Sequence, residues 1–495
     1  MSESMQQIIQ SFARVNVLVV GDALLDTYLE GVPGRLCREA PVPLLDLIDR
    51  KDMPGGAGNT AVNLRALGAQ TTLLSVTGAD NEGNTLRKIL ERSEIASENL
   101  VLCEKRGTCA KNRLYAGKQM TARFDLGTRD CLSPETAQAL IQRLDGLFRS
   151  ADAVIISDYG CGVVTGEVIE HLCKLQEQSP RLMLVDSRNR LSDYRNLGAT
   201  VVKPNYEEAL MLLGFDGAGP AGEKRAEKIL PFGEEILSLT GTHIAAVSMD
   251  SDGALIFEKG REPYRTYGSS STNSYSAGAG DTFAAAFTLA LATGSETTLA
   301  AEIASAAAAV VVAKEGTAAC SQHELLARVS YDGKYITDLG RLVLILEAHR
   351  KQGRRIVFTN GCFDILHRGH ITYLNRAKNP GDIMVVGVNS DSSVQRLKGP
   401  ERPINTLEDR VKVLSALSCV DYLAAFDGQT ASDLVRVVRP DVFVKGGDYT
   451  KDRLPEAPVV EELGGVVRIL PFLDNRSTTR IIEKVQKFQS SRVQG

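Results

Sequence analysis

Short apolar segments alternate with alanine- and leucine-rich segments of helical period along the whole chain. Several apolar segments of the first half are bounded by turn-forming residues, and they predict strands. These strands are Asn16–Val20, Ala153–Ser157, Leu182–Val185, Thr200–Val202 and Ile244–Ser248. Helices are predicted at Gly58–Leu67, Asp281–Thr293 and Leu299–Lys314. Such alternation of strands and helices is typical of an α/β fold.

The pattern changes near residue 330, where a second α/β series begins. Residues 326–338 are polar, lack a strong period and contain the turn signal Tyr331-Asp332-Gly333-Lys334. A predicted helix at Leu339–Gln352 and a predicted strand at Arg355–Thr359 follow. A chain of 495 residues is also too long for one hydrophobic core. We therefore predict two unlike α/β domains, residues 1–330 and 338–495.

Composition and charge narrow the class of protein. Hydrophobic residues make up 43% and charged residues 24%, as in ordinary soluble proteins. The net charge of −4 provides no basic field, so no nucleic-acid partner is expected. No apolar stretch approaches the ~20 residues of a membrane span, and the N-terminus lacks the apolar block of a signal peptide. The nine cysteines contain no Cys-x-x-Cys pair, which indicates the reducing cytoplasm rather than disulfides or zinc.

Small residues precede one predicted helix, in the run Ala277-Gly278-Ala279-Gly280-Asp281. Such a helix start presents free N–H groups and the positive end of the helix dipole. It can bind the γ-phosphate of ATP and stabilise the charge that develops during transfer. Asp281 is then placed to act as general base toward the attacking hydroxyl. Helix capping is the alternative role of Asp281, but it would not explain the small residues before it.

Two earlier motifs suit a polyol. Gly21-Asp22 ends a predicted strand and is followed by Asp26, and carboxylates at strand ends can accept hydrogen bonds from hydroxyls. The run Pro54-Gly55-Gly56-Ala57-Gly58-Asn59 opens the next helix. Glycines such as Gly56 let the backbone approach a ligand closely, and Asn59 can bond sugar hydroxyls. Each motif alone is a weak signal, because glycine-rich turns before helices are common.

In this order, and with Asn205-Tyr206-Glu207-Glu208 and Lys314-Glu315-Gly316-Thr317-Ala318, the motifs resemble the ribokinase family of carbohydrate kinases over residues 12–325. The resemblance implies a ribokinase-like fold and Mg²⁺ held with the nucleotide near Glu208. It also implies a nucleotide site formed by Asn205, Glu208, Gly278, Ala279 and Gly280. A strand-end turn is the alternative interpretation of Asn205.

One motif departs from this family. Its members usually carry Asp-x-Thr before Gly-Ala-Gly-Asp, where this chain has Tyr275-Ser276-Ala277. The loss of the acidic and hydroxyl side chains weakens the expectation of kinase activity more than that of a kinase fold. A degenerate sugar-binding or dimerisation module therefore remains an alternative for the first half.

The second half carries two histidines at a predicted helix start, in the run Asn360-Gly361-Cys362-Phe363-Asp364-Ile365-Leu366-His367-Arg368-Gly369-His370. Both imidazoles and free N–H groups can face one phosphate-sized site. A metal site is the alternative, but no third ligand has matching spacing. Basic or hydroxyl-bearing clusters recur at later strand ends and helix starts, which favours a shared phosphate site. The candidates are Lys398, Arg402, Lys445, Gly447, Asp448, Ser477 and Thr478.

This set resembles the cytidylyltransferase-like nucleotidyltransferases over nearly all of residues 353–485. The resemblance implies a Rossmann-like domain in which a substrate phosphate attacks the α-phosphate of a nucleotide and releases pyrophosphate. His367 and His370 would stabilise charge on the phosphates, with Phe363 at the nucleotide site. Lys398 would bind the triphosphate, and Mg²⁺ would neutralise it.

The two halves in this order resemble the bifunctional heptose kinase/adenylyltransferases of lipopolysaccharide core synthesis. Arg35, Glu39-Ala40-Pro41-Val42-Pro43 and Ser157-Asp158-Tyr159 belong to the matching stretches. The resemblance implies that ATP phosphorylates D-glycero-β-D-manno-heptose 7-phosphate at C1, and that AMP passes from ATP to the heptose 1-phosphate. It implies sugar contacts from Asp22, Asp26, Arg35, Gly56 and Asn59, and a homodimer is expected. Another sugar phosphate, or CTP as donor, remains an alternative.

Overall fold

The computed structural model describes residues 2–39, 42–117, 119–215, 225–268, 276–329, 334–379, 382–447 and 450–470. The chain divides into two compact units, each with a hydrophobic core of its own. The first unit is Gln6–Arg328, and the second is Val329–Gly495 together with Met1–Met5.

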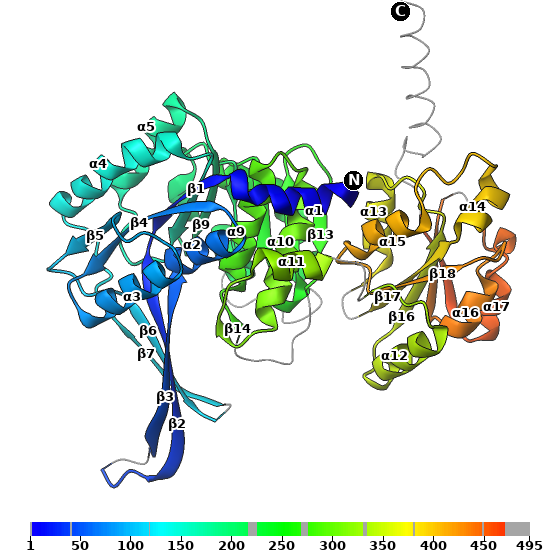
Figure 1. The fold of residues 1–495 in the computed structure, drawn as a ribbon, viewed down its shortest axis with the longest axis horizontal. Helices are drawn as coiled ribbons and strands as arrows, with labels where there is room; N and C mark the ends of the chain where they lie inside the picture. Colours follow the sequence, from blue (N-terminus) through cyan, green and yellow to red (C-terminus); the bar gives the residue numbers. More distant parts are fainter. Residues whose placement is uncertain are drawn as a thin grey trace, which may run out of the picture. The chain divides into compact units, whose positions relative to one another are not determined.

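A large, mostly parallel sheet forms the centre of the first unit (Figure 1). Its interior strand β1 has the run Val17–Val20 buried on both faces, as expected for a parallel strand covered by helices. The order of strands among the described residues is β13-β12-β11-β10-β9-β8-β1-β4-β5. Within this order the pairs β11–β12 and β12–β13 are antiparallel, and the other pairs are parallel. The strands are β1 Asn16–Gly21, β4 Gln70–Gly78, β5 Leu100–Cys103, β8 Ala153–Asp158, β9 Leu182–Ser187, β10 Val201–Val202, β11 Ile244–Ser248, β12 Ala254–Glu258 and β13 Tyr264–Thr266.

Helices cover this sheet. Leu144 and Phe148 of α4 and Leu172 of α5 share one hydrophobic core with Leu18 and Ile156 of the sheet. The alanine-rich helix α9 packs against both α2 and α10, since small side chains let helices approach closely. The helices of this part of the chain are α1 Ser2–Ser11, α2 Ala57–Ala66, α3 Asn81–Arg92, α4 Pro134–Ser150, α5 Gly166–Gln178, α6 Tyr206–Leu212, α7 Arg225–Ile229, α8 Gly233–Thr240, α9 Ala279–Ala292, α10 Thr297–Val312 and α11 Gln322–Val329.

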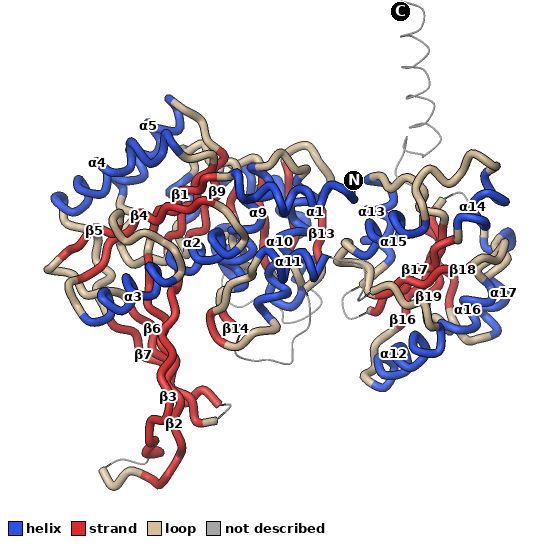
Figure 2. The backbone as a smooth tube through the Cα atoms, viewed as in Figure 1, coloured by secondary structure: helices blue, strands red, loops and turns tan. Residues whose placement is uncertain are grey.

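A second sheet projects from the first unit, in the order β3-β2-β6-β7. Figure 2 shows its strands continuing well past the helices that flank the large sheet. The outer parts carry exposed apolar side chains, among them Leu36, Leu47, Ile48 and Phe124. The strands are β2 Ala23–Leu36, β3 Pro43–Gly56, β6 Ala110–Ala116 and β7 Gln119–Leu126. A short parallel pair, β14 Ser276–Ala277 and β15 Gly316–Thr317, forms a separate small sheet.

The second unit contains a parallel sheet in the order β18-β17-β16-β19-β20. Its core joins Phe358 of β16 and Phe443 of β19, whose rings stack with centroids 5.9 Å apart, to Leu346 of α12. The elements are α12 Leu339–Lys351, β16 Ile356–Gly361, α13 Arg368–Ala377, β17 Ile383–Asn389, α14 Asp391–Lys398, α15 Leu407–Ser415, β18 Tyr422–Phe426, α16 Ser432–Val438, β19 Val442–Gly446, α17 Ala457–Glu462 and β20 Val466–Leu470.

The expected α/β class is confirmed in both units, and each strand predicted from the apolar pattern coincides with an observed one. The helix predicted from Asp281 begins two residues earlier, at Ala279, because Gly278 is its N-cap. None of the helices that the structure describes has the length and apolar character of a membrane-spanning segment.

Candidate active sites

The strand order of the large sheet reverses between β1 and β8, which are direct neighbours. In such sheets ligands bind outside the carboxyl ends of the strands at this reversal. Gly21 ends β1 and is followed by Asp22, while Asp158 ends β8 and is followed by Tyr159. The topology therefore brings two of the sequence motifs to one edge of the sheet.

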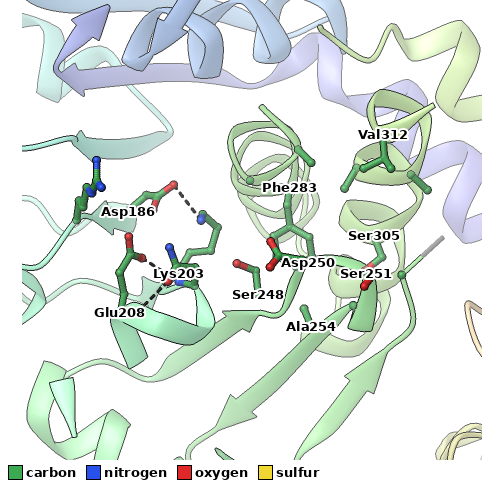
Figure 3. Close-up of a pocket in the computed structure, with 18 of the residues that line it drawn as sticks. Asp186, Lys203, Glu208, Ser248, Asp250, Ser251, Ala254, Phe283, Ser305 and Val312 are labelled. Atoms are coloured by element: carbon green, nitrogen blue, oxygen red, sulfur yellow. Dashed lines mark hydrogen bonds and ion pairs between the residues drawn. The ribbon is translucent and has the colours of Figure 1, made fainter. Parts of the chain in front are cut away.

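A cavity of about 560 Å³ opens near this edge. Asp186, Lys203 and Glu208 gather at one end of it, and Phe283 and Val312 lie toward the other (Figure 3). A polar end beside an apolar end suits a nucleotide, with its phosphates at the first and its base at the second. The lining also includes Lys111, Asp158, Tyr159, Asn205, Ala254, Ala279, Gly280, Ser305, Ala308 and Ala309.

The start of α9 supplies the anion-binding end of this cavity. Gly278 is the N-cap, with a left-handed φ of 86°, and it makes no side-chain cap. A Cβ on Gly278 would lie 2.5 Å from Nδ2 of Asn59, so glycine suits both the backbone and the space. The first N–H groups of the helix, including those of Ala279 and Gly280, can therefore face a phosphate. Asp281 lies inside the first turn and is not the cap.

Asp281 is held by two hydrogen-bond donors. Its Oδ2 accepts from Nδ2 of Asn59 at 2.6 Å, and its Oδ1 accepts from the hydroxyl of Tyr159 at 2.5 Å. Only 5% of Asp281 is exposed. Burial raises the pKa of Asp281 to about 6, although both donors favour the carboxylate. The group is thus an ionised acceptor at neutral pH, and its pKa lies close to the range that suits a general base.

Lys203 provides a buried cation beside this helix start. Its Nζ lies 3.0 Å from Oδ2 of Asp186 and would lie 3.5 Å from a Cβ on Gly280. Burial acts to lower the pKa of Lys203, but the carboxylates of Asp186 and Glu208 outweigh it and raise that pKa. Lys203 therefore stays charged and can face a phosphate bound at α9.

Asn205 and Glu208 form the capping box of α6. Asn205 Oδ1 accepts from the backbone N–H of Glu208 at 2.8 Å, and Glu208 Oε2 accepts from that of Asn205 at 2.9 Å. The motif therefore begins a helix, and both residues also line the cavity. Asp186 and Glu208 offer carboxylate oxygens there, the donors that Mg²⁺ prefers.

The two predicted sugar-binding carboxylates have different surroundings. Asp22 is 1% exposed, and its carboxylate accepts backbone N–H bonds from Tyr159 at 2.8 Å, Cys161 at 2.9 Å and Val163 at 3.0 Å. Asp26 instead pairs with Arg113 at 2.8 Å and accepts from Thr317 at 3.2 Å.

Gly56 lies against both the sugar-binding motif and Tyr159. It has a φ of 57°, and a Cβ there would lie 2.5 Å from the carbonyl oxygen of Asp22 and 3.1 Å from the Tyr159 ring. Arg35 lies elsewhere, exposed in the outer part of β2. Arg35 and Asp26 are nine positions apart on β2, which is about 30 Å at the usual rise per strand residue. Arg35 is therefore far from the cavity within its own chain.

In the second unit the strand order reverses between β16 and β19. Asn360 lies near the carboxyl end of β16, and Lys445 of β19 donates to its Oδ1 at 2.8 Å and its carbonyl oxygen at 3.2 Å. Burial lowers the pKa of Lys445. The pair therefore lies at the edge of the sheet where a ligand of this fold binds.

The two histidines lie together after β16. His367 is the N-cap of α13, and its Nδ1 accepts from the backbone N–H of Gly369 at 3.1 Å. The rings of His367 and His370 stack with centroids 4.0 Å apart, and Phe363 meets His370 edge-on at 5.4 Å. Burial, with a smaller contribution from His367, lowers the pKa of His370 to about 4. His370 is therefore neutral, and its buried Nδ1 has no hydrogen-bond partner among the described residues.

The remaining residues predicted to bind phosphate have different surroundings. Lys398 ends α14 and is exposed, and Gly447 follows β19 with a φ of 113°. Arg402 forms an ion pair with the buried carboxylate of Asp364, so its charge is already matched within the protein. Asp448, Ser477 and Thr478 lie outside the described residues.

The comparisons with known proteins match both halves of the chain. The pfkB family carbohydrate kinases match residues 16–324, and the cytidylyltransferase-like family matches residues 358–484. The bifunctional protein HldE of Desulfatibacillum aliphaticivorans is 36% identical over 481 residues, 96% of this chain and 96% of its own. That of Wolinella succinogenes is 37% identical over 485 residues, 97% of this chain and 99% of its own. The chain belongs to the HldE family.

The resemblance to the bifunctional heptose kinase/adenylyltransferases is thereby confirmed: this HldE-family chain joins a sugar kinase to a nucleotidyltransferase. Among solved structures, Escherichia coli phosphofructokinase-2 in complex with potassium has a TM-score of 0.52 at 20% identity. The match covers 63% of this chain and 97% of that chain, and it shows the fold of the first unit alone.

Several residues that line the cavity of the first unit do not stand out in the sequence. Tyr159 belongs to a matching stretch but has no chemical pattern around it, and Asp186, Lys203 and Lys111 belong to no motif. Asp186 and Lys203 are polar residues in or just after short strands, and that position could have identified them. Lys111 lies on β6 of the projecting sheet, which the apolar pattern does not predict.

Proposed function

We propose that the first unit transfers the γ-phosphoryl group of ATP to O1 of D-glycero-β-D-manno-heptose 7-phosphate. The observation that carries this proposal is the buried carboxylate of Asp281 directly behind the uncapped start of α9. Asp281 takes the proton of the sugar hydroxyl as its oxygen bonds to phosphorus. The bond from the γ-phosphorus to the bridging oxygen breaks, and ADP leaves. The N–H groups of α9 and Lys203 stabilise the charge on the transferring group.

We propose that the second unit joins heptose 1-phosphate to the α-phosphate of ATP. The sugar phosphate oxygen bonds to the α-phosphorus, pyrophosphate leaves, and ADP-heptose results. His370 is neutral and has an unpartnered nitrogen that can donate to a phosphate oxygen. His367 and Lys445 lie at the same reversal of strand order and hold the phosphates in line. The roles of Lys398, Arg402, Gly447, Asp448, Ser477 and Thr478 stay predictions.

Mg²⁺ is proposed as the cofactor of both reactions, bound with ATP. In the first unit Asp186 and Glu208 would hold it, and it would neutralise the charge of the phosphates there. No cluster of three or more His, Cys, Asp or Glu side chains in the described part of the chain could hold a metal ion. The two carboxylates of Asp186 and Glu208 therefore fit a Mg²⁺ ion that is held largely by phosphates and water, as is usual for this ion.

Two further proposals concern assembly and location. The projecting sheet carries exposed apolar side chains, including Leu36, Leu47 and Ile48, which supports a homodimer formed through this sheet. None of the nine cysteines forms a disulfide, which supports a location in the reducing cytoplasm. Analytical ultracentrifugation of the parent and of Ile48→Asp tests the dimer. A dimer that is unchanged by Ile48→Asp would place the contact elsewhere.

The function is tested by following ADP and pyrophosphate separately on the purified protein. Heptose 7-phosphate with ATP should yield ADP, and heptose 1-phosphate with ATP should yield pyrophosphate. Replacing ATP with CTP tests the alternative that CTP is the nucleotide donor. We expect little pyrophosphate release with CTP. Absence of ADP formation with any sugar phosphate would instead favour a degenerate first half.

A further inference from the structure

The hydroxyl of Tyr159 makes the shortest described contact to the carboxylate of Asp281, 2.5 Å from its Oδ1. Burial and the neighbouring carboxylate of Asp281 raise the pKa of the phenol well above its ordinary value. Tyr159 therefore keeps its proton throughout the working pH range and can only be the donor in this bond. Asn59 occupies the other oxygen at 2.6 Å, so each oxygen accepts one bond from the protein.

The segment that carries Tyr159 follows β8, and Asp22, which follows the neighbouring strand β1, holds this segment in place. The carboxylate of Asp22 accepts the backbone N–H groups of Tyr159, Cys161 and Val163. Burial raises the pKa of Asp22, and these three bonds oppose that rise by favouring the carboxylate. A buried carboxylate whose oxygens face three N–H groups has a role in holding a loop. Asp22 thus connects the end of β1 to the residue that contacts the general base.

Other contacts fix the ring of Tyr159. Nζ of Lys111 lies 4.9 Å from the ring centroid, and a Cβ on Gly56 would come within 3.1 Å of the ring. The phenol therefore has little freedom to leave Asp281, because the ring is bounded by β6 on one side and by the start of α2 on another. A donor held this firmly keeps its partner in one orientation.

We propose that Tyr159 is a positioning residue of the kinase reaction, which holds Oδ1 of Asp281 so that the carboxylate stays ionised and oriented toward the sugar hydroxyl. This inference rests on the proposed kinase function and deepens it. Asp22 supports Tyr159 through the backbone of the connecting segment and acts on Asp281 only through Tyr159. Asp22 is then a loop anchor rather than a sugar ligand, which leaves Asp26 as the predicted carboxylate contact to the sugar.

The titratable groups around Asp281 come from several elements. They are Tyr159 after β8, Asp186 of β9, Lys203 after β10, Glu208 of α6 and Lys111 of β6. Asp186 acts to raise the pKa of Asp281, and Lys203 acts to lower it. Removal of the Tyr159 hydroxyl leaves all of these charges in place, so its effect reports one hydrogen bond.

The test is Tyr159→Phe in the full-length protein. The parent carboxylate of Asp281 should titrate near pH 6, and the variant should titrate about one pH unit higher, because a donor to the charged form is lost. The titration is read by NMR on protein labelled with ¹³C at the aspartate carboxyl carbons. The resonance that disappears in Asp281→Asn assigns the group. This readout requires no substrate.

The kinase readout accompanies the titration. With heptose 7-phosphate and ATP, Tyr159→Phe should lower kcat about tenfold at pH 7, of which about twofold comes from the smaller ionised fraction of Asp281 and the rest from its lost orientation. The KM for ATP should change less than twofold. The acid limb of its kcat profile should move upward together with the titration. Tyr194→Phe is the matched control, since it removes a buried hydroxyl that donates to Asp158 at 2.7 Å, and it should leave both profiles at the parent positions.

The two ideas fail in different ways. An Asp281 titration that is the same in Tyr159→Phe and in the parent overturns the positioning role, whatever the turnover. A variant that is slower with an unmoved acid limb assigns Tyr159 to packing only, and also overturns it. If the parent forms no ADP with any sugar phosphate, the proposed kinase function fails, while the NMR titration still decides whether Tyr159 controls Asp281.

Discussion

The two candidate sites of this chain present different chemical groups. The first centres on a buried carboxylate, Asp281, whose pKa is raised to about 6 by burial and whose oxygens are held by Asn59 and Tyr159. The second centres on stacked imidazoles, and burial lowers the pKa of His370 to about 4. Burial thus disfavours the charged form in both sites, but at neutral pH it leaves an ionised carboxylate in the first and a neutral imidazole in the second.

The attacking groups explain this difference. A sugar hydroxyl must lose a proton as it attacks, so the kinase site needs a proton acceptor near neutral pH. A sugar phosphate is already an anion, so the transferase site needs donors that hold and stabilise phosphate oxygens. On the proposed mechanisms, the state of the nucleophile accounts for the carboxylate in the first site and the imidazoles in the second.

The largest expected effect is that of Asp281→Asn on the kinase. Loss of the general base should lower the turnover for ADP formation by about 10²–10⁴-fold. Asp80→Asn is the matched control, because Asp80 caps α3 by accepting from the N–H of Gly83 at 2.8 Å. It should keep near-parent turnover. Asp281→Asn with a rate within a few-fold of the parent would remove Asp281 from the mechanism.

His370→Ala should lower adenylyl transfer about a hundredfold or more, since one preorganised donor to the transition state is lost. Thermal stability and ATP affinity should change much less than turnover. Pyrophosphate release and a thermal melt provide the two measurements. His349→Ala is the matched control in the same unit, because His349 pairs with Tyr422 at 3.0 Å and should leave turnover unchanged. An unfolded His370→Ala would mean that the histidine is structural.

The pH dependence sharpens the comparison. Asp281 must be ionised to act, so the parent-to-Asp281→Asn rate ratio should fall about tenfold per pH unit below about 6. His370 has a pKa near 4 and stays neutral from about pH 5.5 upward, so the parent-to-His370→Ala ratio should be flat there. The ionisation of the substrate phosphates affects parent and variant equally, so it drops out of each ratio. Two flat ratios, or two falling ones, would remove the proposed distinction between base and donor.

The smallest effect is expected from separating the halves. A protein ending near residue 330 and another beginning near 338 should each fold, because each contains its own core. Each should keep its own turnover within about twofold. Circular dichroism and the two product assays provide the measurements. Halves that are both insoluble, beside a soluble parent, would contradict two self-sufficient domains.

Much of the fold was predictable because its signal is local. The apolar run of β1 and the small-residue helix α9 identify themselves within about ten residues. The projecting sheet could not be predicted in the same way, because every position of β7 is exposed and no apolar alternation results. Pro33 and Gly31 also interrupt the pattern of β2.

The site was predictable only as far as single motifs reach. Asp281, His367 and His370 follow from helix starts, but the contact between Tyr159 and Asp281 joins residues 122 positions apart. Asn59 was expected to bond sugar hydroxyls, and nothing in the sequence indicates that its Nδ2 donates to Asp281. A lone basic residue gives no sign of its partner: Arg402 was predicted to bind phosphate, and it pairs with Asp364, 38 residues earlier.

The central claim is that one chain carries two independent sites, and a crossed assay of two full-length variants tests it most directly. ADP formation and pyrophosphate release are measured on both Asp281→Asn and His370→Ala, each with its own heptose phosphate. The account predicts that Asp281→Asn keeps parent pyrophosphate release and that His370→Ala keeps parent ADP formation, each within about twofold, while the other activity falls about a hundredfold or more. A single substitution that lowers both activities to a similar extent would contradict two separate sites.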